Sequence, residues 1–295
     1  MVTHVRHAIA VVCALGCLCS CKNDPVGSAA ADALAGRDSI ISANHSAARV
    51  ETIPEEWIVK AKSDLRIAYG HTSHGSQLVT GMQGLVTSRG QLYAFNSTGS
   101  GGALQLRDTP FSGASDLGNP DRIAWEAATR TYLNAHPEIN VVIWSWCGQV
   151  SSATESDINT YLTLMSGLER DYPSVSFVYM TGHLDGTGTS GNLHRRNEQI
   201  RAYVRVNKKI LFDFADIESY DPDGQFFADK HANDNCDYDS DANGTLDRNW
   251  ASDWQAAHPG EWYDCSAAHS QPLNGNLKAY AAWWLWTRIA GWDGK

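Results

Sequence analysis

The sequence is poor in cysteine, in basic residues and in long apolar runs, and each shortage excludes a class of partner, metal site or membrane segment. Lys and Arg total 23 against 33 Asp and Glu, which gives a net charge of −10. Nucleic acid and anionic membrane surfaces are therefore poor partners. Seven cysteines are present, but none has the C-x-x-C spacing of a common zinc site. The apolar run 8–19 is too short to span a bilayer.

The N-terminal segment has the pattern of an export signal. A short basic start precedes the apolar run 8–19, and the sequence LCSC then resembles a bacterial lipobox with Cys21 as the lipidated residue. The sequence ALGC, ending at Cys17, is a second choice, and an ordinary cleaved signal peptide is the alternative. We expect an exported protein, anchored to the outer membrane or cell surface as a lipoprotein, or periplasmic or secreted. The predicted divisions are a signal peptide 1–21, a flexible tether 22–52 and a domain 53–295.

The remaining chain alternates apolar strand patterns with amphipathic helices, and 43% hydrophobic residues are enough for a full core. Such alternation predicts an α/β fold with a central parallel sheet of about five strands, covered by helices on both faces. The expected strands are 65–69, 91–95, 139–146, 175–181 and 209–214. Two insertions interrupt the pattern. The Gly/Ser-rich segment 97–118 is expected to wall or cover a site, and the acidic segment 218–263 is expected to be mostly irregular.

The candidate active site begins in the stretch LRIAYGHTSHGSQL, from Leu65 to Leu78. A strand that runs through a tight turn into a helix places side chains at the carboxyl edge of the sheet, where sites of parallel sheets lie. A hydroxyl at this place can act as a nucleophile, and helix N–H groups can stabilise an oxyanion. Ser73 is preferred because it is closer to the strand end, and Ser76 stays open. Either serine could instead cap the helix.

Asp264 and His269 lie just before the last predicted helix, and an acid near a histidine is the pairing that orients an imidazole to take a serine proton. Cys236 and Cys265 flank a loop-rich stretch and are the expected disulfide pair in an oxidising compartment. Cys147 is expected to be a buried free thiol.

An acidic loop matches the first nine positions of an EF-hand-type calcium loop, with glycine at position six. Its expected ligands are Asp239, Asp241, Asn243, the Thr245 carbonyl and Asp247. Trp250 stands at position twelve, so the usual glutamate is replaced by a ligand from elsewhere, with Asp253 or Asp237 as candidates. The alternative is an acidic turn without metal. We expect Ca²⁺ to be structural, with no cofactor for catalysis.

Together these motifs resemble the SGNH (GDSL-like) hydrolase superfamily over roughly residues 65–291. The resemblance implies a flavodoxin-like three-layer sandwich and a Ser–His–Asp site that acts on esters. It assigns Ser73 as nucleophile, His269 as base and Asp264 as its partner. It places Gly75, Gly148 and Gln149 at the oxyanion. The chain departs from the family pattern, with Gly-His-Thr-Ser in place of Gly-Asp-Ser and Gln149 in place of asparagine.

The sequence thus predicts an exported serine hydrolase that cleaves carboxylic esters, with acyl groups on carbohydrates as the proposed substrates. One rival is a non-catalytic, calcium-dependent glycan-binding lipoprotein. Another is metal-assisted hydrolysis by His71, His74 and His183 with Asp213, although no HxH or HExxH spacing is present. The expected partner is a small-molecule or glycan ester, and contact with a membrane is expected only through a lipid anchor.

Overall fold

The computed structural model describes Met1 and residues 40–295. The predicted signal peptide, the lipidation site Cys21 and most of the predicted tether lie outside the described residues. Within the described part of the chain, no helix is both long enough and apolar enough to cross a membrane.

A seven-stranded sheet forms the centre of the fold, in the order β1-β7-β6-β5-β2-β4-β3. Each neighbouring pair of strands is parallel. The strands are β1 (Ile41–Ala43), β2 (Arg66–Gly70), β3 (Phe95–Asn96), β4 (Leu104–Asp108), β5 (Val141–Trp144), β6 (Ser176–Met180) and β7 (Ile210–Phe212). The predicted α/β class with a central parallel sheet is confirmed, and the sheet is larger than expected.

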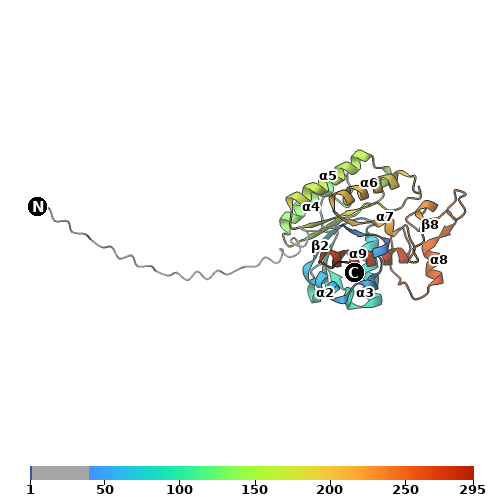
Figure 1. The fold of residues 1–295 in the computed structure, drawn as a ribbon, viewed down its shortest axis with the longest axis horizontal. Coiled ribbons are helices and arrows are strands. Elements are labelled where there is room, and N and C mark those ends of the chain that lie inside the picture. The colour runs from blue at the N-terminus through green and yellow to red at the C-terminus, as the bar shows by residue number, and fades with distance from the viewer. Residues whose placement is uncertain (2–39) are drawn as a thin grey trace.

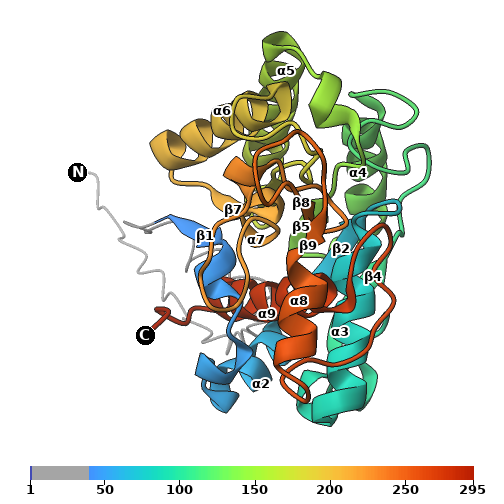
Figure 2. The same cartoon turned by 90° about the vertical axis from the view of Figure 1, so that its right-hand side faces the viewer.

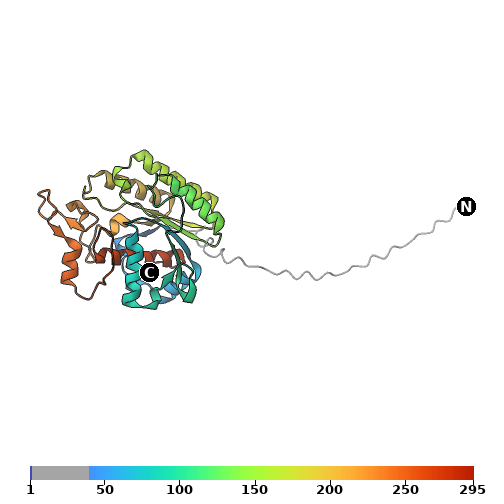
Figure 3. The same cartoon turned by 180° about the vertical axis from the view of Figure 1, so that it is seen from behind.

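Helices cover both faces of this sheet. One layer holds α4 (Ala124–Ala135), α5 (Glu155–Asp171) and α6 (Asn192–Asn207), and the opposite layer holds α2 (Glu55–Asp64), α3 (Ser76–Arg89) and α9 (Pro272–Ile289). The view from behind shows the same two layers on either side of the strands (Figure 3). Because all seven strands run in the same direction, their carboxyl ends lie along the same edge of the sheet.

Side-chain alternation along the strands divides the core into two clusters. In β2, Ile67 and Tyr69 face the α2–α3–α9 layer, while Ala68 faces the other layer. In β5, Ile143 faces the α2–α3–α9 layer and Trp144 faces the other layer. Strands buried on both faces need apolar residues at every position, which is why β2, β5, β6 and β7 are recognisable in the sequence as continuous apolar runs.

Two strands lie where the sequence predicts none. β1 falls inside the predicted tether 22–52, so that prediction is wrong for residues 41–43, which pair with β7. β4 falls inside the Gly/Ser-rich segment 97–118 and pairs with β2. In the predicted strand 91–95, residues 91–93 form a turn of 3₁₀ helix, and the two-residue β3 follows.

The segment 218–263 folds over the carboxyl edge of the sheet. It carries a two-stranded hairpin, β8 (Asp237–Tyr238) and β9 (Arg248–Asn249), followed by α8 (Trp250–Ala257). Figure 2 shows this hairpin and helix in front of the ends of the central strands. The short helix α7 (Phe214–Ile217) leads into the segment from β7.

Helix α9 is buried along most of its length and packs closely against α3. The crossing requires glycine, because a Cβ at Gly81 would lie 2.0 Å from the carbonyl oxygen of Gly275. This close approach fixes the start of α9, and with it the preceding loop that carries His269.

Side-chain hydrogen bonds define the starts of two helices. Thr154 and Asp157 form a capping box at the start of α5. Before α4, the side chain of Asp121 accepts the N–H groups of Ile123 and Ala124, and the helix begins at Ala124.

Candidate active site

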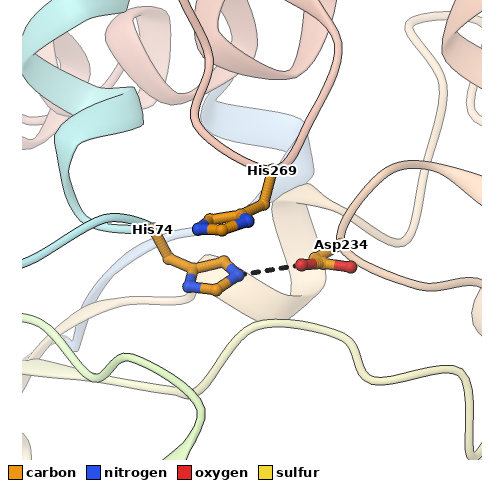
Figure 4. Close-up of side chains that lie close together, drawn as sticks. All are labelled: His74, Asp234 and His269. Carbon is orange, nitrogen blue, oxygen red and sulfur yellow. Dashed lines mark hydrogen bonds and ion pairs between the residues drawn. The ribbon is translucent and has the colours of Figure 1, made fainter.

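Five polar side chains meet at the carboxyl edge of the sheet, next to the segment that covers it. His74 comes from the turn after β2, Cys147 from the loop after β5 and His183 from the loop after β6. Asp234 comes from the covering segment and His269 from the loop before α9. Figure 4 shows the His74 ring stacked on the His269 ring, with the carboxylate of Asp234 beside them and bonded to His74. The first three positions follow from the shared direction of parallel strands.

Three of these side chains form a hydrogen-bonded chain. The Sγ atom of Cys147 lies 3.4 Å from His74 Nδ1, and His74 Nε2 lies 2.8 Å from Asp234 Oδ2. The thiol and the carboxylate therefore contact opposite nitrogens of one imidazole. This is the order of nucleophile, base and orienting acid that defines a catalytic triad, irrespective of chain position.

Ser73 adds a hydroxyl to the same group. Its Oγ lies 3.4 Å from Cys147 Sγ, and its carbonyl oxygen accepts the hydroxyl of Ser76 at 2.6 Å. The Ser76 hydroxyl is thus bonded within its own turn, whereas the Ser73 hydroxyl faces the cluster. Of the two serines that the sequence leaves open, Ser73 is the one beside the thiol.

The imidazole of His74 is enclosed by two further histidine rings. His183 stacks on it with ring centroids 3.7 Å apart and planes at 4°, and His269 stacks with centroids 4.5 Å apart. The Nδ1 atom of His183 lies 2.7 Å from the carbonyl oxygen of Leu184. Because a carbonyl oxygen can only accept, Nδ1 carries the proton and Nε2 of the neutral ring is an acceptor. This buried Nε2 has no hydrogen-bond partner among the described residues.

The surroundings favour a neutral imidazole and an ionised carboxylate. Burial lowers the pKa of His74, a positive charge on His183 would lower it further, and the hydrogen bond that His74 donates to Asp234 only partly opposes this. Burial alone would raise the pKa of Asp234, but the hydrogen bond that it accepts from His74 and the electrostatic interaction with the two histidine rings outweigh this, and the pKa is lowered. A neutral imidazole can accept a proton from the thiol.

The backbone of the His269 loop is held in an uncommon conformation. His269 has φ of +61°, in the left-handed region that a residue with a side chain rarely adopts. The neighbouring carbonyl of Ala268 accepts the side-chain amide of Gln77, which is fully buried in α3. The loop is thus tied to α3, which begins two residues after His74, and the surrounding structure offsets the strain.

The three residues predicted as a serine triad are only partly brought together. Ser73 and His269 both lie at the cluster, but no hydrogen bond joins them within residues 40–295. Asp264 is exposed, and the structure shows no bond between it and His269 in the same range. Asp234 occupies the position beside an imidazole that the sequence analysis gives to Asp264.

The predicted oxyanion residues have different surroundings. Gly75 is buried at the start of α3, where a Cβ would lie 2.2 Å from Ser145 Oγ. Gly148 is exposed beside His183. The amide nitrogen of Gln149 donates to Asp116 at 3.1 Å, and its oxygen accepts the N–H of Cys147 at 2.9 Å. The Gln149 side chain therefore orients the thiol-bearing residue.

The predicted disulfide is absent, because Cys236 and Cys265 are both free thiols. Cys236 Sγ contacts Ser270 Oγ at 3.6 Å, and Cys265 Sγ contacts the carbonyl of Pro272 at 3.5 Å. The two cysteines thus have separate neighbours. Cys147 is free as predicted, but it is half-buried and not fully buried.

The predicted calcium loop has the backbone of a tight acidic turn. Asp239 accepts the N–H groups of Asn243 and Gly244, and Asp247 accepts both the N–H and the hydroxyl of Ser240. Gly244 has φ of +88°, which suits the glycine at position six of a calcium loop.

Neither candidate for the missing glutamate ligand is free of bonds. Asp253 pairs with Arg248, and Asp237 is bonded to the side chains of Asn235 and Asn249. Calcium binding therefore stays a prediction.

The alternative metal set from the sequence is divided between three places. His74 and His183 are stacked, but His71 bonds to Asp108 at 2.6 Å. Asp213 is held by the guanidinium of Arg201, at 2.7 Å to each carboxylate oxygen. A different group offers three potential ligands: His74, Asp234 and His269 each contribute one ligand atom, and these atoms lie within 4.8 Å of one another.

A cavity adjoins the turn after β2. It has a volume of 330 Å³ and borders Gly70, His71 and Thr72, and its other wall includes Phe111 and Ser115 from the segment 97–118. A larger cavity of 630 Å³ lies beside His45 and Tyr280. The five cluster residues line neither cavity, but Thr72, which borders the smaller one, directly precedes Ser73 in the chain.

Sequence reasoning did not place Cys147 and Asp234 beside His74. Cys147 follows β5 after Ser145 and Trp146 and precedes a glycine, a position that indicates a residue at the sheet edge. Asp234 lies 160 residues from His74 in the chain and carries no motif that links the two.

The comparisons with known proteins supply no relative. A scan against protein-family models matches none, and a search of curated proteins finds no significant match.

Proposed function

We propose that this chain is an exported hydrolase of carboxylic esters that works by acyl transfer through Cys147, His74 and Asp234. One observation carries the proposal: Cys147 Sγ and Asp234 Oδ2 contact opposite nitrogens of His74, at 3.4 Å and 2.8 Å. At this edge of the sheet, the Sγ atom of Cys147 is a potential nucleophile in contact with a histidine nitrogen that can accept its proton.

Each residue has one task in the reaction. His74 takes the thiol proton of Cys147, and the sulfur attacks the ester carbonyl carbon to form a tetrahedral oxyanion. As the oxyanion collapses, His74 returns the proton to the leaving alcohol, and a thioester to Cys147 remains. Water, deprotonated by His74, then hydrolyses the thioester to the acid and the free thiol. Asp234 keeps the proton of His74 on Nε2, so that Nδ1 is the accepting nitrogen.

The surroundings favour a substrate with hydroxyl groups. The buried Nε2 of His183 is an acceptor without a partner among the described residues, next to the stacked His74. A buried acceptor costs free energy until a donor reaches it, and an alcohol hydroxyl is such a donor. Together with the 330 Å³ cavity beside Thr72, this supports esters of polyhydroxy alcohols, acylated carbohydrates included.

Replacing each nucleophile candidate tests the proposal. Cys147→Ala should reduce kcat/KM for a nitrophenyl ester to near the uncatalysed level, while Ser73→Ala should leave most of the activity, because its hydroxyl only contacts the sulfur. Iodoacetamide should inactivate the wild-type protein, and a substrate-competitive ester should slow this inactivation. Full activity in Cys147→Ala, with loss in Ser73→Ala, would move the nucleophile to the serine that the sequence favours.

A further inference from the structure

The cluster contains a second arrangement that the acyl-transfer chemistry does not use. His269 is exposed, stacks on the catalytic imidazole, and has a ring nitrogen within 4.8 Å of ligand atoms of both His74 and Asp234. Figure 4 shows the two rings and the carboxylate arranged around one space. Within residues 40–295, this is the group of three potential metal ligands that meets this distance criterion.

The chemistry of the three donors selects the ion. Two imidazoles and one carboxylate, with a fourth position open to water, match a tetrahedral Zn²⁺ site. Ca²⁺ and Mg²⁺ prefer oxygen donors and higher coordination numbers, so they fit this set poorly. The exposed edge of His269 gives an ion access to the group from solvent.

We propose that Zn²⁺ binds His74, Asp234 and His269 and reversibly inhibits the enzyme. The inhibition, but not the binding, rests on the proposed function. The nitrogen beside Asp234 is Nε2, at 2.8 Å from Oδ2, so the ion replaces the proton that Nε2 donates there. A neutral imidazole has one remaining proton, which must then reside on Nδ1. Nδ1 faces Cys147 and would donate to the sulfur, so it no longer accepts the thiol proton.

Zinc binding is measured first, independently of activity. The full mature chain, freed of metal by a nitrogen-donor chelator, is titrated with Zn²⁺ by calorimetry and with Co²⁺ by visible absorption. We expect one site per chain with the intense Co²⁺ bands of four-coordinate geometry. His269→Ala should weaken binding by roughly tenfold or more, because loss of a ligand costs at least as much as loss of an outer-shell partner. His136→Ala is the matched control, since His136 precedes β5 at the opposite edge and bonds Arg107.

Two further measurements separate this proposal from the proposed function. Cys147→Ala keeps all three ligands, so it should bind Zn²⁺ as the wild type does even though it is inactive. Zn²⁺ should inhibit wild-type ester hydrolysis at the concentration that fills the site, and the chelator should restore it. Equal Zn²⁺ affinity in His269→Ala and wild type would overturn the site. Saturated binding with undiminished hydrolysis would overturn the inhibition and leave the site.

Discussion

Replacing Lys278 by methionine should strongly destabilise the protein, because this lysine is fully buried and paired with Glu218 beneath the candidate site. Its Nζ donates to Glu218 at 2.7 Å, to Gln77 at 2.6 Å and to Asn274 at 2.8 Å, and the Lys278 and Glu218 side chains have no exposed surface. Met has similar length and fills the space, so the main loss is the charge. Removal of one partner leaves a buried carboxylate uncompensated, which costs about 3–5 kcal/mol.

The assay is thermal unfolding by calorimetry, with activity measured alongside. At roughly 2–4 °C for each kcal/mol, Lys278→Met should lower Tm by about 6–20 °C. The double variant with Glu218→Gln should be more stable than Lys278→Met alone, because no buried charge remains. Activity should also fall, since Glu218 accepts the N–H of Leu184 beside His183 and Gln77 holds the His269 loop. A Tm within about 2 °C of wild type in Lys278→Met would refute this reasoning.

Two further predictions concern the segments at the edges of the domain. His45 fixes the β1 segment through Asp216, where burial would raise the carboxyl pKa but the His45 contacts outweigh it and lower it. The stabilisation by Asp216 is therefore present above the pKa of about 4 that this carboxyl has in the unfolded chain, and it is lost as the pH falls through the lower pKa of the folded state. The difference in Tm between wild type and Asp216→Asn should then shrink from about pH 5 to about pH 3. A constant difference in calorimetry would contradict this. If the acidic loop holds Ca²⁺, chelation with EGTA should lower Tm and reduce activity through the nearby Asp234, and Asp241→Ala should mimic chelation. Identical melting with EGTA and with excess Ca²⁺ would reduce the loop to a surface turn.

The central strands are predictable from the sequence, whereas the edge strands are not. β2 and β5 are buried on both faces, so their apolar runs show in the sequence. β1 has only three residues and follows a segment with the composition of a linker. β4 has apolar residues only at alternate positions in its first half and stands in Gly/Ser-rich surroundings, which conceal it. Pairing with a preformed sheet supplies hydrogen bonds that local sequence does not encode.

The candidate site is predictable in its position but not in its contacts. The turn after β2 and the loop before α9 both reach the cluster, as the alternation of strands and helices implies. The acid that bonds to an imidazole is Asp234 and not Asp264, because Asp264 is exposed while Asp234 lies in the segment that carries the β8–β9 hairpin over the sheet edge. Sequence proximity to a histidine favours Asp264, and only tertiary folding brings Asp234 to His74.

The disulfide prediction fails for a related reason. Their places at the two ends of a loop-rich stretch and an oxidising compartment favour pairing of Cys236 with Cys265, but a disulfide also requires their Cβ atoms to approach closely. Cys236 lies in the turn before β8 against Ser270, and Cys265 lies against the first turn of α9. The spacing of cysteines in a sequence carries no information on this geometry.

The most direct test of the account is to find which atom carries the acyl group during turnover. The protein is mixed with a nitrophenyl ester, quenched in acid, digested and analysed by mass spectrometry. The account predicts one acyl group on the peptide that contains Cys147, released rapidly by neutral hydroxylamine as thioesters are, and its absence in Cys147→Ala. An acyl group on Ser73 that persists in Cys147→Ala would contradict the account.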